Sequence, residues 1–145
     1  MRRGRIMLIG AVGAGKTTLL NALNKIDEPA SKTQALEYNT CSIDTPGEFM
    51  ENPNYYSALF STSLEAEILL FVQDATKKLS IFPPGFAQAF SKRAVGVVTK
   101  IDHPDANVKQ AKEMLKKIDL NGPILAVSAF TGEGIEELRK LLNWG

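Results

Sequence analysis

An eight-residue segment near the start of the chain constrains the fold more than any other feature. Residues Gly10–Thr17 read G-A-V-G-A-G-K-T, which completes the spacing G-x-x-x-x-G-K-[ST] and is followed by a second hydroxyl at Thr18. The apolar run Arg5–Ile9 before it has the length of a buried strand, and Leu19–Asn24 after it has the spacing of a helix with one apolar face. A loop of this kind between a strand and a helix predicts an α/β fold with a phosphate site at the strand's carboxyl end.

The chemistry of this loop follows from its residue types. Glycines let the backbone turn inward, so that successive N–H groups and the helix N-terminus point at phosphate oxygens. Lys16 supplies a positive charge at the β- and γ-phosphates, the Thr17 hydroxyl is the expected Mg²⁺ ligand, and an inward Val12 would narrow the space over the γ-phosphate. We expect nucleotide contacts from Gly10, Val12, Gly13, Ala14, Gly15, Lys16, Thr17 and Thr18.

Length and composition are those of an ordinary globular domain. The 145 residues suit a single domain spanning 1–145, with 44% hydrophobic and 23% charged residues. A net charge of +1 gives no electrostatic reason to expect nucleic acid or a membrane surface as the main partner. The single cysteine, Cys41, cannot form an internal disulfide, which fits a reducing cytosol. No apolar stretch has the length of a membrane span.

Strand-like and helix-like segments alternate along the whole chain. Strands are predicted at Arg3–Ile9, Glu37–Ile43, Glu67–Gln73, Arg93–Thr99 and Pro123–Val127, and helices at Lys16–Lys25, Pro53–Leu64, Asp105–Ile118 and Ile135–Leu142, with a short helical turn at Phe86–Phe90. Alternation of this kind predicts a mostly parallel sheet between two helical layers. The segment 26–37 is too short for an additional antiparallel strand with its loop. We therefore expect five strands in the order 2-1-3-4-5.

A second motif, Asp44–Gly47, follows the second predicted strand. The Asp44 carboxylate can hold Mg²⁺ through its water shell, and the Gly47 N–H can reach a γ-phosphate because glycine permits a close approach. Thr33 is the best candidate for a mobile threonine that closes over Mg²⁺ and the γ-phosphate, although an exposed loop hydroxyl is the alternative interpretation. Thr40 is a weaker candidate because it falls inside a predicted strand.

The motif Thr99–Asp102 ends the fourth predicted strand and selects among nucleobases. The Asp102 carboxylate can accept hydrogen bonds from the N1–H and the exocyclic amine of guanine, and adenine offers no such pair of donors on that edge. Hydrogen bonds to charged groups contribute about 1.5–3 kcal/mol each, which is enough for strong discrimination. The aliphatic stem of Lys100 can cover the base plane. This motif therefore favours guanine over adenine.

A fourth motif, Ser128–Phe130, follows the fifth predicted strand. The small side chain of Ala129 would let its backbone N–H approach the guanine O6, which is an acceptor where adenine carries a donor. Ser128 can brace the neighbouring loop, and Phe130 lies next to the expected base. In this order and position, the three residues complete a predicted guanine pocket.

The ordered set of motifs is similar to that of the small GTP-binding proteins. More narrowly, the segments Lys32–Tyr38, Ile43–Glu48, Tyr55–Leu59 and Ile81–Phe86 resemble the EutP/PduV family. This resemblance implies a three-layer, small-GTPase-like P-loop NTPase fold that binds GTP or GDP with Mg²⁺. It further implies a cytoplasmic bacterial protein of ethanolamine or propanediol utilisation, with association with protein-shelled microcompartments.

Residues expected to face the γ-phosphate during hydrolysis are Lys16, Thr33, Gly47 and Glu48. Many GTPases place a glutamine directly after the glycine of the second motif to orient water. This chain has Glu48 there, and a carboxylate lies unfavourably close to an anionic phosphate. No arginine occurs between Arg5 and Arg93 to act as an internal arginine finger. We therefore expect slow intrinsic hydrolysis.

Three functions are compatible with these motifs. The first is a Mg²⁺-dependent GTP-binding switch or targeting factor that contacts a protein partner through Ile26–Glu37 and Gly47–Leu64. The second is a phosphotransferase that resembles an acetate kinase and uses ATP. That activity needs an acceptor pocket, and the sequence shows no arginine near the switch segments to clamp a carboxylate. The third is a non-catalytic scaffold that binds nucleotide for stability.

Overall fold

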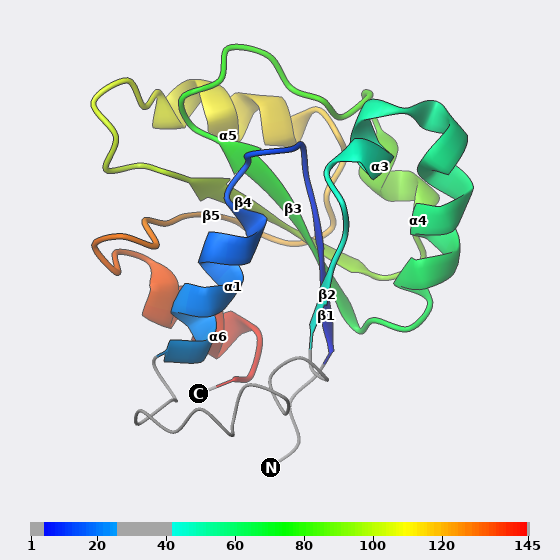
Figure 1. Ribbon diagram of the computed structural model, residues 1–145, viewed down its shortest axis with the longest axis horizontal. Helices are drawn as coiled ribbons and strands as arrows, with labels where there is room; N and C mark the ends of the chain where they lie inside the picture. Colours follow the sequence, from blue (N-terminus) through cyan, green and yellow to red (C-terminus); the bar gives the residue numbers. More distant parts are fainter. Residues whose placement is uncertain (1–4, 26–41, 145) are drawn as a thin grey trace.

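The computed structural model describes residues 5–25 and 42–144, and a five-stranded sheet forms its centre (Figure 1). The strands are β1 (Ile6–Ile9), β2 (Ser42–Asp44), β3 (Ile68–Asp74), β4 (Arg93–Thr99) and β5 (Ile124–Ala126). Their spatial order is β2-β1-β3-β4-β5, and every neighbouring pair is parallel. The predicted α/β class and strand order are confirmed.

Helices cover both faces of this sheet, which gives three layers (Figure 1). They are α1 (Lys16–Lys25), α3 (Glu48–Glu51), α4 (Tyr56–Ser63), α5 (Val108–Lys116) and α6 (Ile135–Leu141), with 3₁₀ turns η2 (Pro53–Tyr55) and η3 (Phe86–Ala89). Helices α1 and α6 contact each other on one face, whereas α4 and α5 pack on the opposite face. Within the described ranges, no helix is long and apolar enough to cross a bilayer.

The two faces of β1 divide the core into two clusters. Successive side chains of a strand point to opposite faces. Ile6 and Leu8 accordingly pack with the residues of α1 and α6, whereas Met7 and Ile9 pack with those of α4 and α5. All four side chains are fully buried. The strand that leads into the phosphate loop is therefore held from both sides, so the start of that loop is fixed in space.

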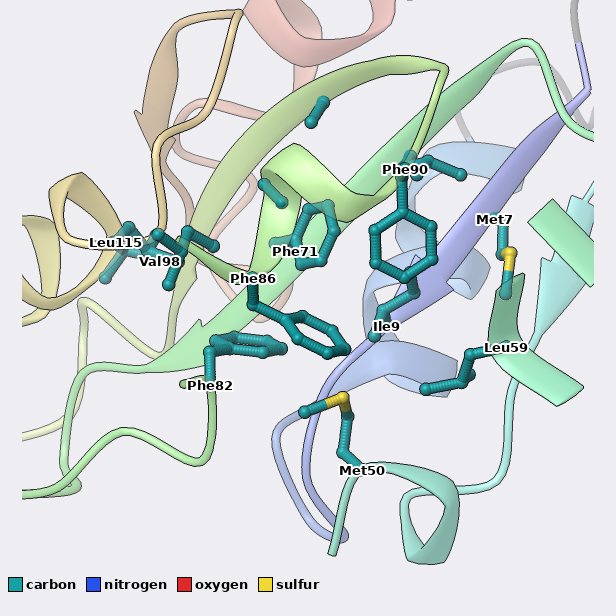
Figure 2. Close-up of a cluster of buried hydrophobic side chains, with 14 of the residues drawn as sticks. Met7, Ile9, Met50, Leu59, Phe71, Phe82, Phe86, Phe90, Val98 and Leu115 are labelled. Atoms are coloured by element: carbon teal, nitrogen blue, oxygen red, sulfur yellow. The ribbon is translucent and has the colours of Figure 1, made fainter. Parts of the chain in front are cut away.

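An aromatic cluster fills the second of these faces (Figure 2). Phe71 of β3 makes edge-on contacts with Phe82, Phe86 and Phe90, with ring centroids 5.5, 6.2 and 5.6 Å apart. Edge-to-face pairs at such distances are favourable beyond the apolar area that they bury. The cluster holds the long connection between β3 and β4 against the sheet, close to the carboxyl end of β3.

Two predicted helices differ from the observed ones at their starts. Helix α5 begins at Val108 rather than at Asp105, because the Asn107 side chain accepts a hydrogen bond from Gln110 N at 3.0 Å and caps the helix there. The predicted helix from Pro53 is divided into the turn η2 and helix α4. Helix α3 was not predicted, since four residues are too short to show helical periodicity.

Candidate nucleotide site

The described motif residues all lie at one edge of the sheet, where the parallel strands end (Figure 1). The phosphate loop follows β1, the Asp44–Gly47 motif follows β2, the Thr99–Asp102 motif ends β4, and Ser128–Phe130 comes shortly after β5. This edge is where open α/β sheets bind ligands. Thr33, Thr40, Cys41 and the proposed partner segment Ile26–Glu37 fall outside the described residues.

The backbone conformation of the phosphate loop requires glycine at two of its positions. Gly13 and Gly15 have φ angles of +79° and +95°, in the left-handed region where other residues are strained. Ala14 N donates a hydrogen bond to Ala11 O at 3.1 Å and closes the turn between them. The loop therefore adopts the inward curl that the sequence predicts, immediately before α1.

Lys16, the first residue of α1, is directed back along its own loop. Its side chain is only 6% exposed, and its Nζ donates to Gly10 O at 2.9 Å and to Ala11 O at 3.0 Å. Two of the three ammonium donors are therefore occupied by backbone carbonyls. The third remains for an anion at the mouth of the loop.

Carboxylates surround this ammonium group. Burial lowers the pKa of Lys16, and the nearby carboxylates of Asp44, Glu48 and Glu51 offset only part of that effect, so that the pKa lies below its ordinary value. The three carboxylates around Lys16 make this part of the site acidic. Because they would repel a phosphate, we expect a phosphate to bind here together with a divalent cation.

The expected Mg²⁺ ligands are in direct contact. Thr17 Oγ1 donates to Asp44 Oδ2 at 2.5 Å, which joins the start of α1 to the end of β2. Both are oxygen ligands of the hard type that Mg²⁺ prefers, and both side chains are exposed. Among the described residues, no group of three or more His, Cys, Asp or Glu side chains is placed to hold a metal. The two oxygens fit a Mg²⁺ ion that takes its other ligands from phosphate and water.

Gly47 contacts the phosphate loop so closely that no other residue fits. A Cβ built on Gly47 lies 2.3 Å from Val12 N and 2.5 Å from Val12 Cα. The Val12 side chain is 54% exposed and borders Gly47. The neighbour that requires a glycine here is Val12, which the sequence did not identify, and the expected approach of the Gly47 N–H to a γ-phosphate stays a prediction.

Helix α3 brings an unpredicted carboxylate to the loop. Val12 N donates to Glu51 Oε2 at 3.1 Å, so a backbone donor of the phosphate loop is paired with a side chain of the next motif. Glu48, the residue in the expected water-orienting position, is exposed at the first position of the same helix. The acidic pair Glu48 and Glu51 within one short helix is the sequence signal from which this contact could have been suspected.

A hollow of about 160 Å³ lies beside the start of α1, between the β4 and β5 loops. It is lined by Gly15, Thr18, Thr99, Lys100, Asp102, His103, Ala129 and Phe130. All of these except His103 are residues from which a base or phosphate contact is predicted. The structure thus brings the two motifs that are predicted to contact the base together beside the phosphate loop.

Asp102 is held in position by the residue predicted to brace its loop. Ser128 Oγ donates to Asp102 Oδ1 at 2.7 Å and accepts from Thr131 N at 3.0 Å, and Ser128 is fully buried. An ionised carboxylate has about four acceptor positions, so this bond leaves several for a ligand. Phe130 is 93% exposed at the rim of the same hollow and offers an uncovered aromatic face.

The predicted base half and phosphate half of the site are connected by Thr99, the last residue of β4, and by Lys100, which follows it. Thr99 Oγ1 donates to Ala14 O at 2.7 Å, and Lys100 Nζ donates to Gly13 O at 2.9 Å. Lys100 Nζ also forms an ion pair with Asp74 Oδ2 at 2.9 Å. Asp74 belongs to none of the predicted motifs, although its place after the apolar run of β3 is visible in the sequence.

A second cavity of about 410 Å³ lies on the other side of the phosphate loop, and the sequence did not predict it. Val12 and Glu51 line its end near the loop, whereas Gln73, Lys77 and Ser80 line the end near β3. It therefore reaches the phosphate loop and is lined both by the donors Lys77 and Ser80 and by the carboxylates of Glu51 and Asp74.

Comparisons with known proteins agree with this architecture. Residues 3–144 match the PduV-EutP family, described as ethanolamine utilisation - propanediol utilisation. The chain is 40% identical over 136 residues to the probable acetate kinase EutP of Salmonella typhimurium, covering 92% of this chain and 86% of that protein. It is 42% identical over 140 residues to the propanediol utilization protein PduV of Citrobacter freundii, covering 96% and 93%.

Two solved structures share the fold across the chain. The bacterial selenocysteine-specific elongation factor EF-Sec superposes with a TM-score of 0.65 at 24% identity, over 99% of this chain and 29% of that one. The elongation factor SelB of Methanococcus maripaludis gives a TM-score of 0.60 at 22% identity, over 99% and 33%. At these identities, the likeness establishes the three-layer fold of the chain.

Proposed function

Because the chain belongs to the PduV-EutP family, whose described context is ethanolamine and propanediol utilisation, we propose that it binds guanine nucleotides and hydrolyses GTP slowly with Mg²⁺. One observation carries this proposal. The Asp102 carboxylate is held by the buried Ser128 hydroxyl at 2.7 Å in a hollow beside the phosphate loop. A fixed acceptor at that place pairs with the two donors of guanine and leaves adenine without a matching edge.

The remaining roles follow the geometry of the loop. The backbone N–H groups of residues 13–18 would hold the phosphates, and Lys16 would place its free donor between the β- and γ-phosphates. Thr17 and Asp44 would hold Mg²⁺, and Thr33 is the proposed third protein ligand. Bound Mg²⁺ would neutralise charge that develops on the phosphates. Glu48 would lie near the attacking water.

We propose that this GTP cycle controls a protein partner. Helices α3 and α4 lie within the proposed contact surface Gly47–Leu64, where Tyr55 is 44% and Leu64 is 66% exposed. Leu64 lies at the far end of α4, close to the amino end of β3, whereas Tyr55 comes soon after the Asp44–Gly47 motif. An exposed aromatic side chain such as that of Tyr55 is suited to a partner that distinguishes two nucleotide states. We propose that this action takes place in the bacterial cytoplasm, with microcompartments as the point of attachment, and the family's description as ethanolamine and propanediol utilisation supports this proposal.

The proposed function predicts the rate of GTP hydrolysis. Single-turnover hydrolysis of bound GTP should proceed at about 10⁻⁴ s⁻¹, the scale of unassisted small GTPases, because Glu48 replaces a neutral water-orienting side chain and the switch segments contain no arginine. The measurement is release of phosphate from preloaded protein, with a chelator of Mg²⁺ as the control. Turnover on the scale of seconds without any partner would contradict slow intrinsic hydrolysis.

A second candidate function is phosphoryl transfer to a small carboxylate. The cavity of about 410 Å³ favours it, because Lys77 and Ser80 could hold a carboxylate in a space that reaches Val12 of the phosphate loop. Lys77 would be the cationic clamp for the carboxylate, in place of an arginine, which the switch segments lack. The EutP relative from Salmonella typhimurium is named a probable acetate kinase.

Trapping of acyl phosphate separates the two functions. The protein is incubated with acetate and either GTP or ATP in the presence of hydroxylamine, which converts acetyl phosphate into a hydroxamate. The proposed GTPase function predicts phosphate release without hydroxamate. Hydroxamate that forms in the wild type and is lost in Lys77→Met, with nucleotide affinity unchanged, would instead establish the kinase function.

A further inference from the structure

Asp74 is a buried carboxylate at the carboxyl end of β3, outside the motifs that contact phosphate and base. Its side chain is 3% exposed. Asp74 Oδ1 accepts from Thr76 N at 2.8 Å and from Thr76 Oγ1 at 2.6 Å, whereas Asp74 Oδ2 lies 2.9 Å from Lys100 Nζ. One carboxylate therefore anchors its own loop with one oxygen and the lysine of the base motif with the other.

The negative charge of Asp74 strengthens its contact with the Lys100 ammonium. Burial raises the pKa of Asp74, but the hydrogen bonds from Thr76 and the contact with Lys100 lower it by more, so that the pKa lies below its ordinary value. The carboxylate is thus ionised at neutral pH. A buried negative charge is costly unless it is paired, and the Lys100 ammonium is the cation that pairs with it.

Lys100 is held in an uncommon conformation between two partners. Its φ angle is +63°, in the left-handed region that few residues other than glycine adopt. Its ammonium contacts Asp74 on β3 and Gly13 O in the phosphate loop, both at 2.9 Å. With its tip fixed in this way, the aliphatic stem forms one wall of the base hollow.

We propose that Asp74 is a positioning residue for nucleotide binding, an inference that rests on the proposed guanine-nucleotide function. By holding the Lys100 ammonium, Asp74 keeps the lysine stem against the base and keeps Gly13 O in the position that shapes the phosphate loop. The contact connects base and phosphate recognition through a single side chain. Loss of the Asp74 charge should therefore speed the release of GDP and GTP alike.

The test measures dissociation of fluorescent GDP and GTP from the full chain, together with the melting temperature of each variant. Asp74→Asn retains an oxygen for Thr76 but does not pair with an ammonium, and should release nucleotide about tenfold faster. Lys100→Met keeps most of the aliphatic stem and removes the ammonium. It should also release nucleotide about tenfold faster, and the substituted side chain is partly exposed rather than buried. Glu113→Gln is the matched control, because it breaks the 2.9 Å ion pair with Lys116 on the surface of α5.

The double variant distinguishes positioning from general stabilisation. If Asp74 acts through Lys100, adding Asp74→Asn to Lys100→Met should accelerate release no further. Wild-type release rates in both single variants, or equal acceleration by Asp74→Asn in both backgrounds, would overturn the inference while leaving guanine-nucleotide binding intact. Absence of any guanine-nucleotide binding by the wild type would overturn both.

Discussion

Replacement of Lys16 by alanine is expected to weaken binding of GTP and GDP by about a hundredfold or more. Lys16 is only 6% exposed, and its ammonium lies against Gly10 O and Ala11 O at the start of α1, where we propose that the phosphates bind. Hydrogen bonds to charged groups contribute about 1.5–3 kcal/mol each, and in the proposed complex Lys16 would add the charge–charge attraction of its ammonium to the hydrogen bond of its remaining donor. Equilibrium titration with a fluorescent guanine nucleotide measures the loss.

The control for this variant separates loss of a contact from loss of the fold. Lys109→Ala removes an exposed lysine from α5 and should bind nucleotide as the wild type does. The melting temperature of Lys16→Ala is measured alongside, since two backbone carbonyls lose their partner. Wild-type affinity in folded Lys16→Ala would show that Gly10–Thr17 is not the phosphate site.

The second large effect concerns the choice of base. Asp102→Asn should weaken GTP by about a hundredfold and improve binding of xanthosine triphosphate. The amide replaces one acceptor by a donor, which opposes the donors of guanine and matches the C2 carbonyl of xanthine. Ser128 Oγ can still donate to the remaining oxygen, so the side chain keeps its position.

Competition between GTP and xanthosine triphosphate measures this exchange directly. Asp105→Asn is the matched control, because it changes an exposed aspartate in the same loop that does not line the base hollow. An unchanged preference in Asp102→Asn would show that this carboxylate does not contact the base.

The sheet was predictable because its signals are local. The apolar runs of β3 and β4 are buried on both faces, as continuous hydrophobic segments of parallel sheets are. The strand–loop–helix order around Lys16 determined where the ligand edge must lie. The expectation of five strands without an additional edge strand rests on the shortness of the predicted connection 26–37.

Other parts of the site depend on contacts between distant residues and gave no local signal. Val12 N meets Glu51 Oε2 across 39 positions of the chain, through a helix too short to show periodicity. The ion pair of Asp74 with Lys100 likewise depends on the adjacency of β3 and β4. The cavity beside Lys77 arises from the connection between β3 and β4, which the aromatic cluster folds back onto the sheet.

The spacing of the motifs predicted the roles of their residues but not all of the contacts between them. The motifs predicted separate Mg²⁺ roles for Thr17 and Asp44, and the direct contact of their side chains, 2.5 Å apart, became apparent only in the folded chain. They also predicted that Ser128 would brace the base loop, but its partner, Asp102, became apparent only in the folded chain. The role of Thr33 stays a prediction, since that residue lies outside the described ranges.

The most direct test of the account is equilibrium binding of GTP, GDP and ATP to the purified full chain in the presence of Mg²⁺. Asp102 and Ala129 in one hollow beside the phosphate loop predict tight binding of both guanine nucleotides, with ATP at least a hundredfold weaker. Tight binding of ATP together with weak binding of GTP would contradict the central claim that this site selects guanine.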